Sequence, residues 1–234
     1  MKQNEVYISR FSAWAPGVEN VKEWEEWAQD KREIIIDSKS PDLSFTEPMF
    51  RRRLSQISKM TVQVVHDLLP VAEDTKIIFL SFRGELSYQF KLNKMFIEDN
   101  EIKPAAFSLS VFNAPAALAS MAFSLKGGYS AVYPGENSFV MGLTLAEAAF
   151  ICKLEPRPHG LDESEELIFV YADEDIPNEY KDIYSGTHNP LAFGFVLTRN
   201  PSGQAVSTIP FSALKEGINT PEDFLKRLIL SKLS

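Results

Sequence analysis

Glu136 stands at the tip of a turn whose layout is typical of a catalytic nucleophile. The glycine pair 127–128 predicts the end of a helix, and residues 129–133 alternate weakly, as in a short strand. The Pro-Gly pair 134–135 then forces a sharp turn before an apolar helix that begins near Glu136. Helix, strand, sharp turn and buried helix form a nucleophile elbow, which exposes the side chain at its tip. The sequence therefore predicts a nucleophile position, occupied by a glutamate.

The carboxylate of Glu136 is a poor carrier of an acyl group. An acylated carboxylate is a mixed anhydride, which transfers or hydrolyses readily, so we expect no stable acyl adduct on Glu136. A carboxylate at a helix N-terminus is also stabilised by the free amides there, by about 0.3–1 kcal/mol. Helix stabilisation is the simpler interpretation of Glu136, a block against acylation is the functional one, and the two are compatible.

Other catalytic arrangements are absent from the sequence. It contains no G-x-S-x-G, Walker or G-x-G-x-x-G motif, and no histidine pair has the spacing of metal ligands. His66 falls in a helical pattern and His159 in a proline-rich loop, which favours structural roles for both. Cys152 is the only cysteine, which excludes an intrachain disulfide and a multi-cysteine metal site. We predict no metal and no cofactor.

The elements around Glu136 alternate between strands and helices. Residues 76–82, 167–171 and 191–197 are near-continuous apolar runs, as in strands buried on both faces. A helix is predicted from Asn20, with Glu23 completing a capping box, and a second box at Thr220 and Asp223 begins the last helix. The alternation predicts an α/β fold whose strands share one sheet.

Two helices flank the predicted elbow strand. Asn113 is predicted to cap the first helix with its side chain, with Pro115 in the first turn. Its small residues would let another backbone approach closely: Asn113, Ala117, Ser120 and Ser124. The second helix, up to Ile151, is apolar around most of its circumference, so we expect it to be buried nearly all round.

Two charged clusters have a simple and a functional interpretation. Arg51, Arg52 and Arg53 fall in the first turn of an amphipathic helix predicted over 50–68, where positive charge opposes the helix dipole. A solvated charged face is the simpler interpretation, and docking of an acidic partner is the alternative. The acids 173–175 follow a strand, and we expect a solvated strand exit there, with a magnesium site as the alternative.

Residues 105–150 resemble β-ketoacyl synthases, the thiolase-fold condensing enzymes of fatty acid and polyketide assembly. Those enzymes show an Asn, a following Ser, a Gly-Leu-x-Gly-Pro segment, and a strand that leads into an Ala-Cys-Ala-Ser elbow. The residues at matching spacings are Asn113, Ser120, Ser124-Leu125-Lys126-Gly127 and Ser138. The catalytic cysteine position falls on Glu136. By length and elbow, the chain is most similar to the short ketosynthase-like subunits of aryl polyene pigment clusters, which resemble chain-length factors.

This resemblance implies a thiolase-like half-fold with a mixed sheet flanked by helices, lacking the C-terminal half of ketosynthases. We expect one domain over residues 1–234, with a core of about 5–200 and a C-terminal extension over 201–234 that carries a helix. Ketosynthases take both catalytic histidines from their second half, and the surroundings of His188 match neither histidine loop. The resemblance thus implies no catalytic residue in this chain, with Glu136 at the nucleophile position.

The resemblance also implies partners. We expect a heterodimer with an active β-ketoacyl synthase, formed edge to edge through the strand before the elbow, and transient contact with an acyl carrier protein. The partner's acyl tunnel would run to the dimer interface. The candidate interface or tunnel residues are Phe107, Leu109, Phe112, Asn113, Met121 and Tyr133. The candidate residues for carrier-protein docking are Arg51, Arg52 and Arg53.

Two other functions remain open from the sequence. The chain could be a stand-alone enzyme, such as a malonyl-thioester decarboxylase or a hydrolase that uses Glu136, or a lone acyl-binding scaffold. The net charge of −8 argues against nucleic-acid partners, and no apolar run reaches the length of a membrane span. The single cysteine and the absence of a secretion signal predict a cytoplasmic protein.

Overall fold

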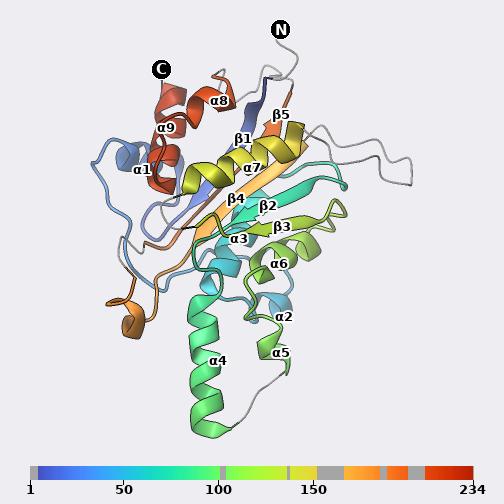
Figure 1. Ribbon diagram of the computed structural model, residues 1–234, viewed down its shortest axis with the longest axis vertical. Helices are drawn as coiled ribbons and strands as arrows, with labels where there is room; N and C mark the ends of the chain where they lie inside the picture. Colours follow the sequence, from blue (N-terminus) through green and yellow to red (C-terminus); the bar gives the residue numbers. More distant parts are fainter. Residues whose placement is uncertain are drawn as a thin grey trace.

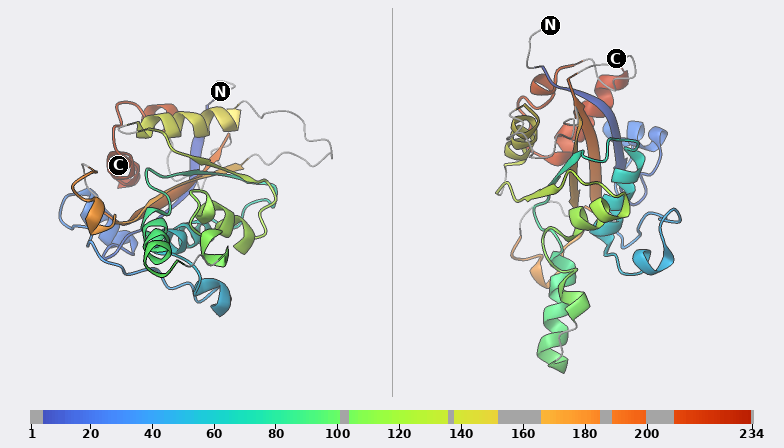
Figure 2. Two further views of the ribbon diagram at one scale, coloured as in Figure 1. Left: turned by 60° about the horizontal axis from the view of Figure 1, so that its bottom comes forward. Right: turned by 90° about the vertical axis from the view of Figure 1, so that its right-hand side faces the viewer.

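A computed structural model gives the fold, which is a single five-stranded sheet between two layers of helices (Figures 1 and 2). The structure describes residues 5–100, 104–135, 138–151, 166–184, 189–199 and 209–233. Four residues singled out in the sequence lie outside these ranges: Glu136, Cys152, His159 and His188.

The sheet is mixed, with strand order β1-β5-β4-β2-β3. The strands are β1 (Tyr7–Trp14), β2 (Lys76–Leu80), β3 (Tyr129–Val132), β4 (Glu166–Asp173) and β5 (Leu191–Thr198). Strands β3, β2 and β4 run parallel to one another, whereas β5 is antiparallel to both β4 and β1. The carboxyl ends of the three parallel strands therefore lie at the same end of the sheet, where Tyr133 follows β3.

Two of the helices begin at the capping residues that the sequence predicts. Capping boxes at Asn20 and Glu23, and at Thr220 and Asp223, have both reciprocal hydrogen bonds, as predicted. The helices are α1 (Val21–Ala28), α2 (Pro48–Arg51), α3 (Gln56–Asp67), α4 (Leu86–Asp99), α5 (Pro104–Phe107), α6 (Ala114–Ala122), α7 (Phe139–Ile151), α8 (Phe211–Leu214) and α9 (Pro221–Leu233). A short 3₁₀ helix spans Asn178–Tyr180.

Each face of the sheet is covered by its own set of helices. Along β2, Ile78 and Leu80 face the cluster that contains residues of α1, α7, α8 and α9, while Ile77 and Phe79 face α3 and α6. Phe224 of α9 lies among the aromatic rings on the first of these faces. None of the described helices has the length and hydropathy needed to cross a bilayer.

The prediction of one continuous helix over 50–68 is wrong, because the helical conformation is interrupted between α2 and α3. Ser55 caps α3 there, and its hydroxyl accepts a hydrogen bond of 3.1 Å from the Ser58 amide. Arg51 consequently lies in the last turn of α2, where positive charge agrees with the helix dipole, and not in a first turn.

The predicted burial of α7 on all sides is also wrong. The inner face lies so close to the sheet that a Cβ on Gly142 would be 1.6 Å from Leu80 Cδ1. On the outer face, Met141 is 60% exposed and Leu145 is exposed as well. Helix α7 is therefore apolar on its outer face without being enclosed there.

Candidate functional site

Strand β3 lies at the edge of the sheet, as the resemblance implied. The carbonyls of Gly128 and Val132 accept hydrogen bonds from the amides of Ile77 and Ser81 in the direction of β2. Because these bonds alternate along a parallel strand, the amide and carbonyl of Ala131 point away from β2. Among the described strands, none pairs with this outer edge. Such an edge is a template for pairing with another chain.

Helix α6 packs behind this edge strand and is tied to it by Asn113. Asn113 precedes α6, but its side chain makes no cap, so that prediction is wrong. Its Nδ2 instead donates a hydrogen bond of 3.1 Å to the Tyr129 hydroxyl at the start of β3. The beginning of the helix and the beginning of the strand are thereby joined.

Two small residues that precede β3, Ser124 and Gly127, have structural roles after the end of α6. The helix ends at Phe123, earlier than the glycine pair predicted, with Ser124 in the left-handed region at φ 54°. The Leu125 amide then donates to the Ser120 carbonyl, as in a Schellman motif. Gly127 has another role, since a Cβ there would lie 2.1 Å from the Asp74 carbonyl oxygen.

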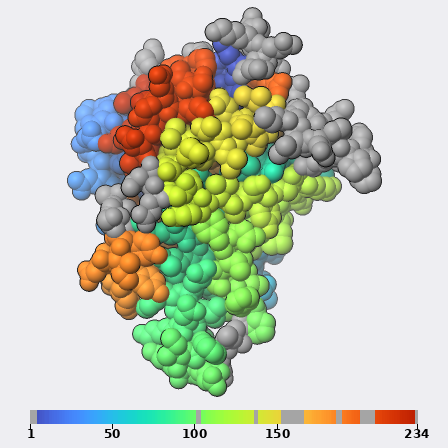
Figure 3. Space-filling view, viewed as in Figure 1, coloured from blue at the N-terminus to red at the C-terminus, as the bar shows by residue number. Residues whose placement is uncertain are grey.

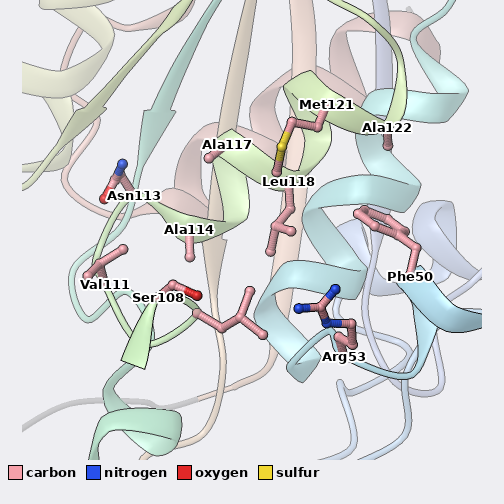
Figure 4. A pocket seen from close by; sticks show the side chains of 11 residues that line it. Phe50, Arg53, Ser108, Val111, Asn113, Ala114, Ala117, Leu118, Met121 and Ala122 are labelled. Atoms are coloured by element: carbon pink, nitrogen blue, oxygen red, sulfur yellow. The ribbon is translucent and has the colours of Figure 1, made fainter. Parts of the chain in front are cut away.

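A pocket of about 500 Å³ opens beside α6 (Figure 4). Its lining comes from α2 and the residues after it, from the segment after α5, and from α6. The lining residues are Phe50, Arg53, Ser108, Leu109, Val111, Asn113, Ala114, Ala117, Leu118, Met121 and Ala122. The volume lies within the range of small-molecule sites, and the lining is mostly apolar. The pocket thus brings together Leu109, Asn113 and Met121 from the candidate interface residues, and Arg53 from the candidate docking residues.

The other candidate interface residues lie outside this pocket. Phe107 is 58% exposed and faces a groove beside α4. Phe112 turns inward, with its ring 6.3 Å from that of Phe79, and a Cβ on Gly84 would lie 2.5 Å from its Cδ2. Tyr133 follows the edge strand and is 55% exposed. Phe112 therefore contributes to packing, and Phe107 and Tyr133 to the surface.

The three arginines have different surroundings. The Arg51 guanidinium donates a hydrogen bond of 3.0 Å to the Leu43 carbonyl. Arg52 and Arg53 are exposed, and neither forms an ion pair with another described residue. Two of the three positive charges are therefore open to solvent near the pocket.

Asp173, the last residue of β4, and the following Glu174 are buried, so the predicted solvated strand exit is wrong for both, whereas Asp175 is half-buried and forms an ion pair with Lys181. Asp173 is only 2% exposed and accepts hydrogen bonds from the Ser81 hydroxyl (2.6 Å), the Phe82 amide (3.0 Å) and the Tyr171 hydroxyl (2.9 Å). Burial raises the pKa of Asp173, although these donors favour its charged form. Asp173 thus anchors the turn between β2 and α4.

Two buried glutamates, Glu85 before α4 and Glu174 after β4, contact the first residues of α3. Glu85 accepts hydrogen bonds from the hydroxyls of Ser55 (2.7 Å) and Ser58 (2.6 Å), and burial raises its pKa to about 7. Glu174 accepts one from the Ile57 amide (3.2 Å), and burial together with the charge of Glu85 raises its pKa to about 8. Within the described ranges, no three His, Cys, Asp or Glu side chains form a group that could hold a metal ion. Glu174 is one of the acids 173–175 singled out from the sequence, but its proximity to Glu85 was not predicted, because Glu85 lies some ninety residues earlier in the chain.

Comparison with known proteins gives one family match. A family model described as "Beta-ketoacyl synthase, N-terminal domain" matches residues 24–222. No curated protein matches the chain.

Solved structures of ketosynthases share the fold. The ketosynthase ApeO in complex with its chain length factor ApeC, from Xenorhabdus doucetiae, matches with a TM-score of 0.68 and 24% identity over 84% of this chain and 79% of that chain. A type II polyketide synthase acyl-carrier protein in complex with its ketosynthase, AntDE:AntF, gives a TM-score of 0.61 at 13% identity, over 83% of this chain and 63% of that one.

The ishigamide ketosynthase/chain length factor gives a TM-score of 0.56 at 12% identity, over 83% of this chain and 58% of that one. The chain thus spans less than two thirds of the second and third of these structures. The predicted α/β fold, with a mixed sheet flanked by helices as in the N-terminal half of a ketosynthase, is confirmed.

Proposed function

Because the chain belongs to the family of β-ketoacyl synthase N-terminal domains, we propose that it is a noncatalytic subunit of the chain-length-factor type. In this role it pairs with an active β-ketoacyl synthase during polyketide or fatty-acid-type chain elongation. Aryl polyene assembly is the pathway class that we assign to the pair, on the resemblance of residues 105–150 to the ketosynthase-like subunits of that pathway.

The outer edge of β3, with which none of the described strands pairs, is the observation that carries this proposal. Its outward backbone groups lie beside Tyr133 and Tyr129, both exposed, and the pocket along α6 continues the same surface. A strand of another chain would satisfy those backbone groups and cover the adjacent apolar side chains. A ketosynthase with a comparable edge strand is the partner that supplies such a strand.

The related structures support this choice of partners. The Xenorhabdus doucetiae structure contains a ketosynthase in complex with its chain length factor, and the ishigamide structure is a ketosynthase/chain length factor. A third contains an acyl-carrier protein in complex with its ketosynthase. We assign Arg52 and Arg53 to transient docking of an acidic carrier protein, because their positive charges are exposed beside the pocket.

Glu136 supports a noncatalytic role from the sequence. It stands where the related enzymes carry a cysteine, and a carboxylate cannot hold an acyl group as a stable intermediate. The pocket gives the subunit another task, which is to close the far end of the partner's acyl tunnel with Leu109 and Met121.

Intact mass spectrometry tests which of the two subunits becomes acylated. The chain, the ketosynthase and an acyl-loaded carrier protein are mixed, and we expect acylation of the ketosynthase alone. The Glu136→Gln variant should behave like the wild type, because Glu136 performs no chemistry. A stable acyl adduct on this chain would refute the proposal. So would malonyl decarboxylation by the isolated chain that Glu136→Gln abolishes, since it would identify a stand-alone enzyme.

A further inference from the structure

Helices α4 and α5 form an arm that extends from the body of the molecule (Figures 1 and 3). Helix α4 has 14 residues, of which Leu92 is the one that is buried. Phe96 is 46% exposed near the end of α4, and Phe107 in α5 is more exposed still. A helix of this length owes most of its stability to packing of its apolar face, and here much of that face is open.

The two helices enclose a groove of about 310 Å³. Its lining residues are Gln89, Leu92, Asn93, Phe96, Phe107, Ser110 and Val111. The Gln89 side chain donates a hydrogen bond of 2.7 Å to the Ser110 carbonyl, which ties α4 to the segment after α5 and keeps the groove formed. None of the lining residues is charged, so an apolar and uncharged occupant suits the groove.

The groove is continuous with the surface around β3. Val111 lines both this groove and the pocket beside α6. Because Asn113, another lining residue of that pocket, donates a hydrogen bond to Tyr129 at the start of β3, the surface runs from the start of β3, along Met121 and Leu109, to Phe107 and Phe96.

The size of a stable interface requires such an extension. Strand β3 has 4 residues, whereas a stable complex uses about 20–30 residues on each side and buries about 1,200–2,000 Å² in total. A partner held at the β3 edge must therefore contact adjoining surfaces. The uncharged groove offers apolar contact in addition to that of the short strand. At about 310 Å³ it lies at the lower limit for a small-molecule site, which favours side chains of a protein partner.

We propose that the partner which pairs with β3 also inserts apolar side chains into the groove between α4 and α5. This inference rests on the proposed function, because the partner is the ketosynthase subunit. It assigns Phe96 and Phe107 as anchors of the complex, at the far end of the interface from the paired strands.

Substitution of the two exposed rings tests this assignment. The variants are Phe96→Asp and Phe107→Asp, and affinity for the ketosynthase subunit is measured by surface plasmon resonance. Val21→Asp is the matched control, because Val21 is an exposed apolar residue of α1, away from the arm. We expect both arm variants to bind at least about tenfold more weakly, since anchors in the core of an interface dominate affinity. The control should bind as the wild type does, and all three should unfold near the wild-type temperature.

The outcomes separate this inference from the proposed function. If the wild type binds no ketosynthase, the proposed function fails and this inference falls with it. If the wild type binds and both arm variants bind equally well, the inference alone is overturned. It is also overturned if Phe96→Asp abolishes self-association of the isolated chain but leaves ketosynthase binding unchanged, because a second copy would then occupy the groove.

Discussion

The Asn113 side chain donates a hydrogen bond of 3.1 Å to the Tyr129 hydroxyl, and so fixes the start of α6 against the start of β3. Asn113 also lines the pocket, so the same residue belongs to the strand edge and to the pocket wall. An exposed hydrogen bond contributes only about 1 kcal/mol to stability. Its importance here is positional, because it holds together the two surfaces that the proposed partner would contact.

Phe112 and Phe107 should differ in their effect on stability. The Phe112 ring packs against Phe79 and Gly84, whereas Phe107 is largely exposed. Phe112→Ala should lower the free energy of unfolding by about 2 kcal/mol, which is less than a fully buried ring would cost. Phe107→Ala should change it by less than about 0.5 kcal/mol. Urea denaturation measures both, and equal effects would show that Phe112 is not a packing residue.

The buried glutamates should make the protein less stable as pH rises from about 4.5 to about 8. Their pKa values are raised from 4.5 to about 7 for Glu85 and to about 8 for Glu174. In this window the folded state retains protons that the unfolded state has released, so the contribution of these two groups to stability is fully present below the window and is lost as pH rises through it.

The slope can reach about 1.4 kcal/mol per pH unit for each group. Denaturation at several pH values measures it, and Glu85→Gln and Glu174→Gln should each flatten the profile. Carboxylates with lowered pKa values, such as Glu23 and Glu73, act below this window. If the free energy of unfolding depends on pH in the same way in the wild type and in both variants, the raised pKa values of Glu85 and Glu174 are contradicted.

Shortening a side chain in the pocket should lengthen the product of the assembled complex. Leu109→Ala and Met121→Ala each enlarge the proposed far end of the tunnel. A longer saturated chain gains about 0.8 kcal/mol for each methylene that it buries, which shifts a product distribution several-fold. Mass spectrometry of the products measures the shift.

Met141→Ala is the control for the tunnel prediction, because Met141 is exposed on α7, across the sheet from the pocket. It should leave the products unchanged. Complexes of both pocket variants that assemble normally and give products of wild-type length would make this subunit a scaffold without control of length.

Local signals allowed much of the fold to be predicted. The capping residues at Asn20 and Thr220 interact with neighbours three positions away, and the runs at 76–82 and 191–197 are too apolar for anything but buried strands. These features need no information from distant parts of the chain.

The wrong predictions depend on distant contacts. The apolar spacing of Phe50 and Leu54 suits a continuous helix, but Ser55 and its cap end that continuity. The burial of Asp173 depends on Ser81 and Phe82, which come from a turn some ninety residues earlier, so the residues around Asp173 in the sequence do not indicate it. The pocket likewise joins Phe50 to α6, which no local pattern encodes.

Assembly through the outer edge of β3 is the central claim, and substitution of Ala131 tests it most directly. The Ala131 amide points away from β2, so Ala131→Pro removes a donor needed by a partner strand while sparing the bonds to β2. Ala131→Ser is the control, because it keeps that amide. Native mass spectrometry of each variant mixed with the ketosynthase subunit should show a one-to-one complex for the wild type and Ala131→Ser, and separate subunits for a folded Ala131→Pro. A one-to-one complex that forms equally well with Ala131→Pro, or no complex with the wild type, would contradict the account.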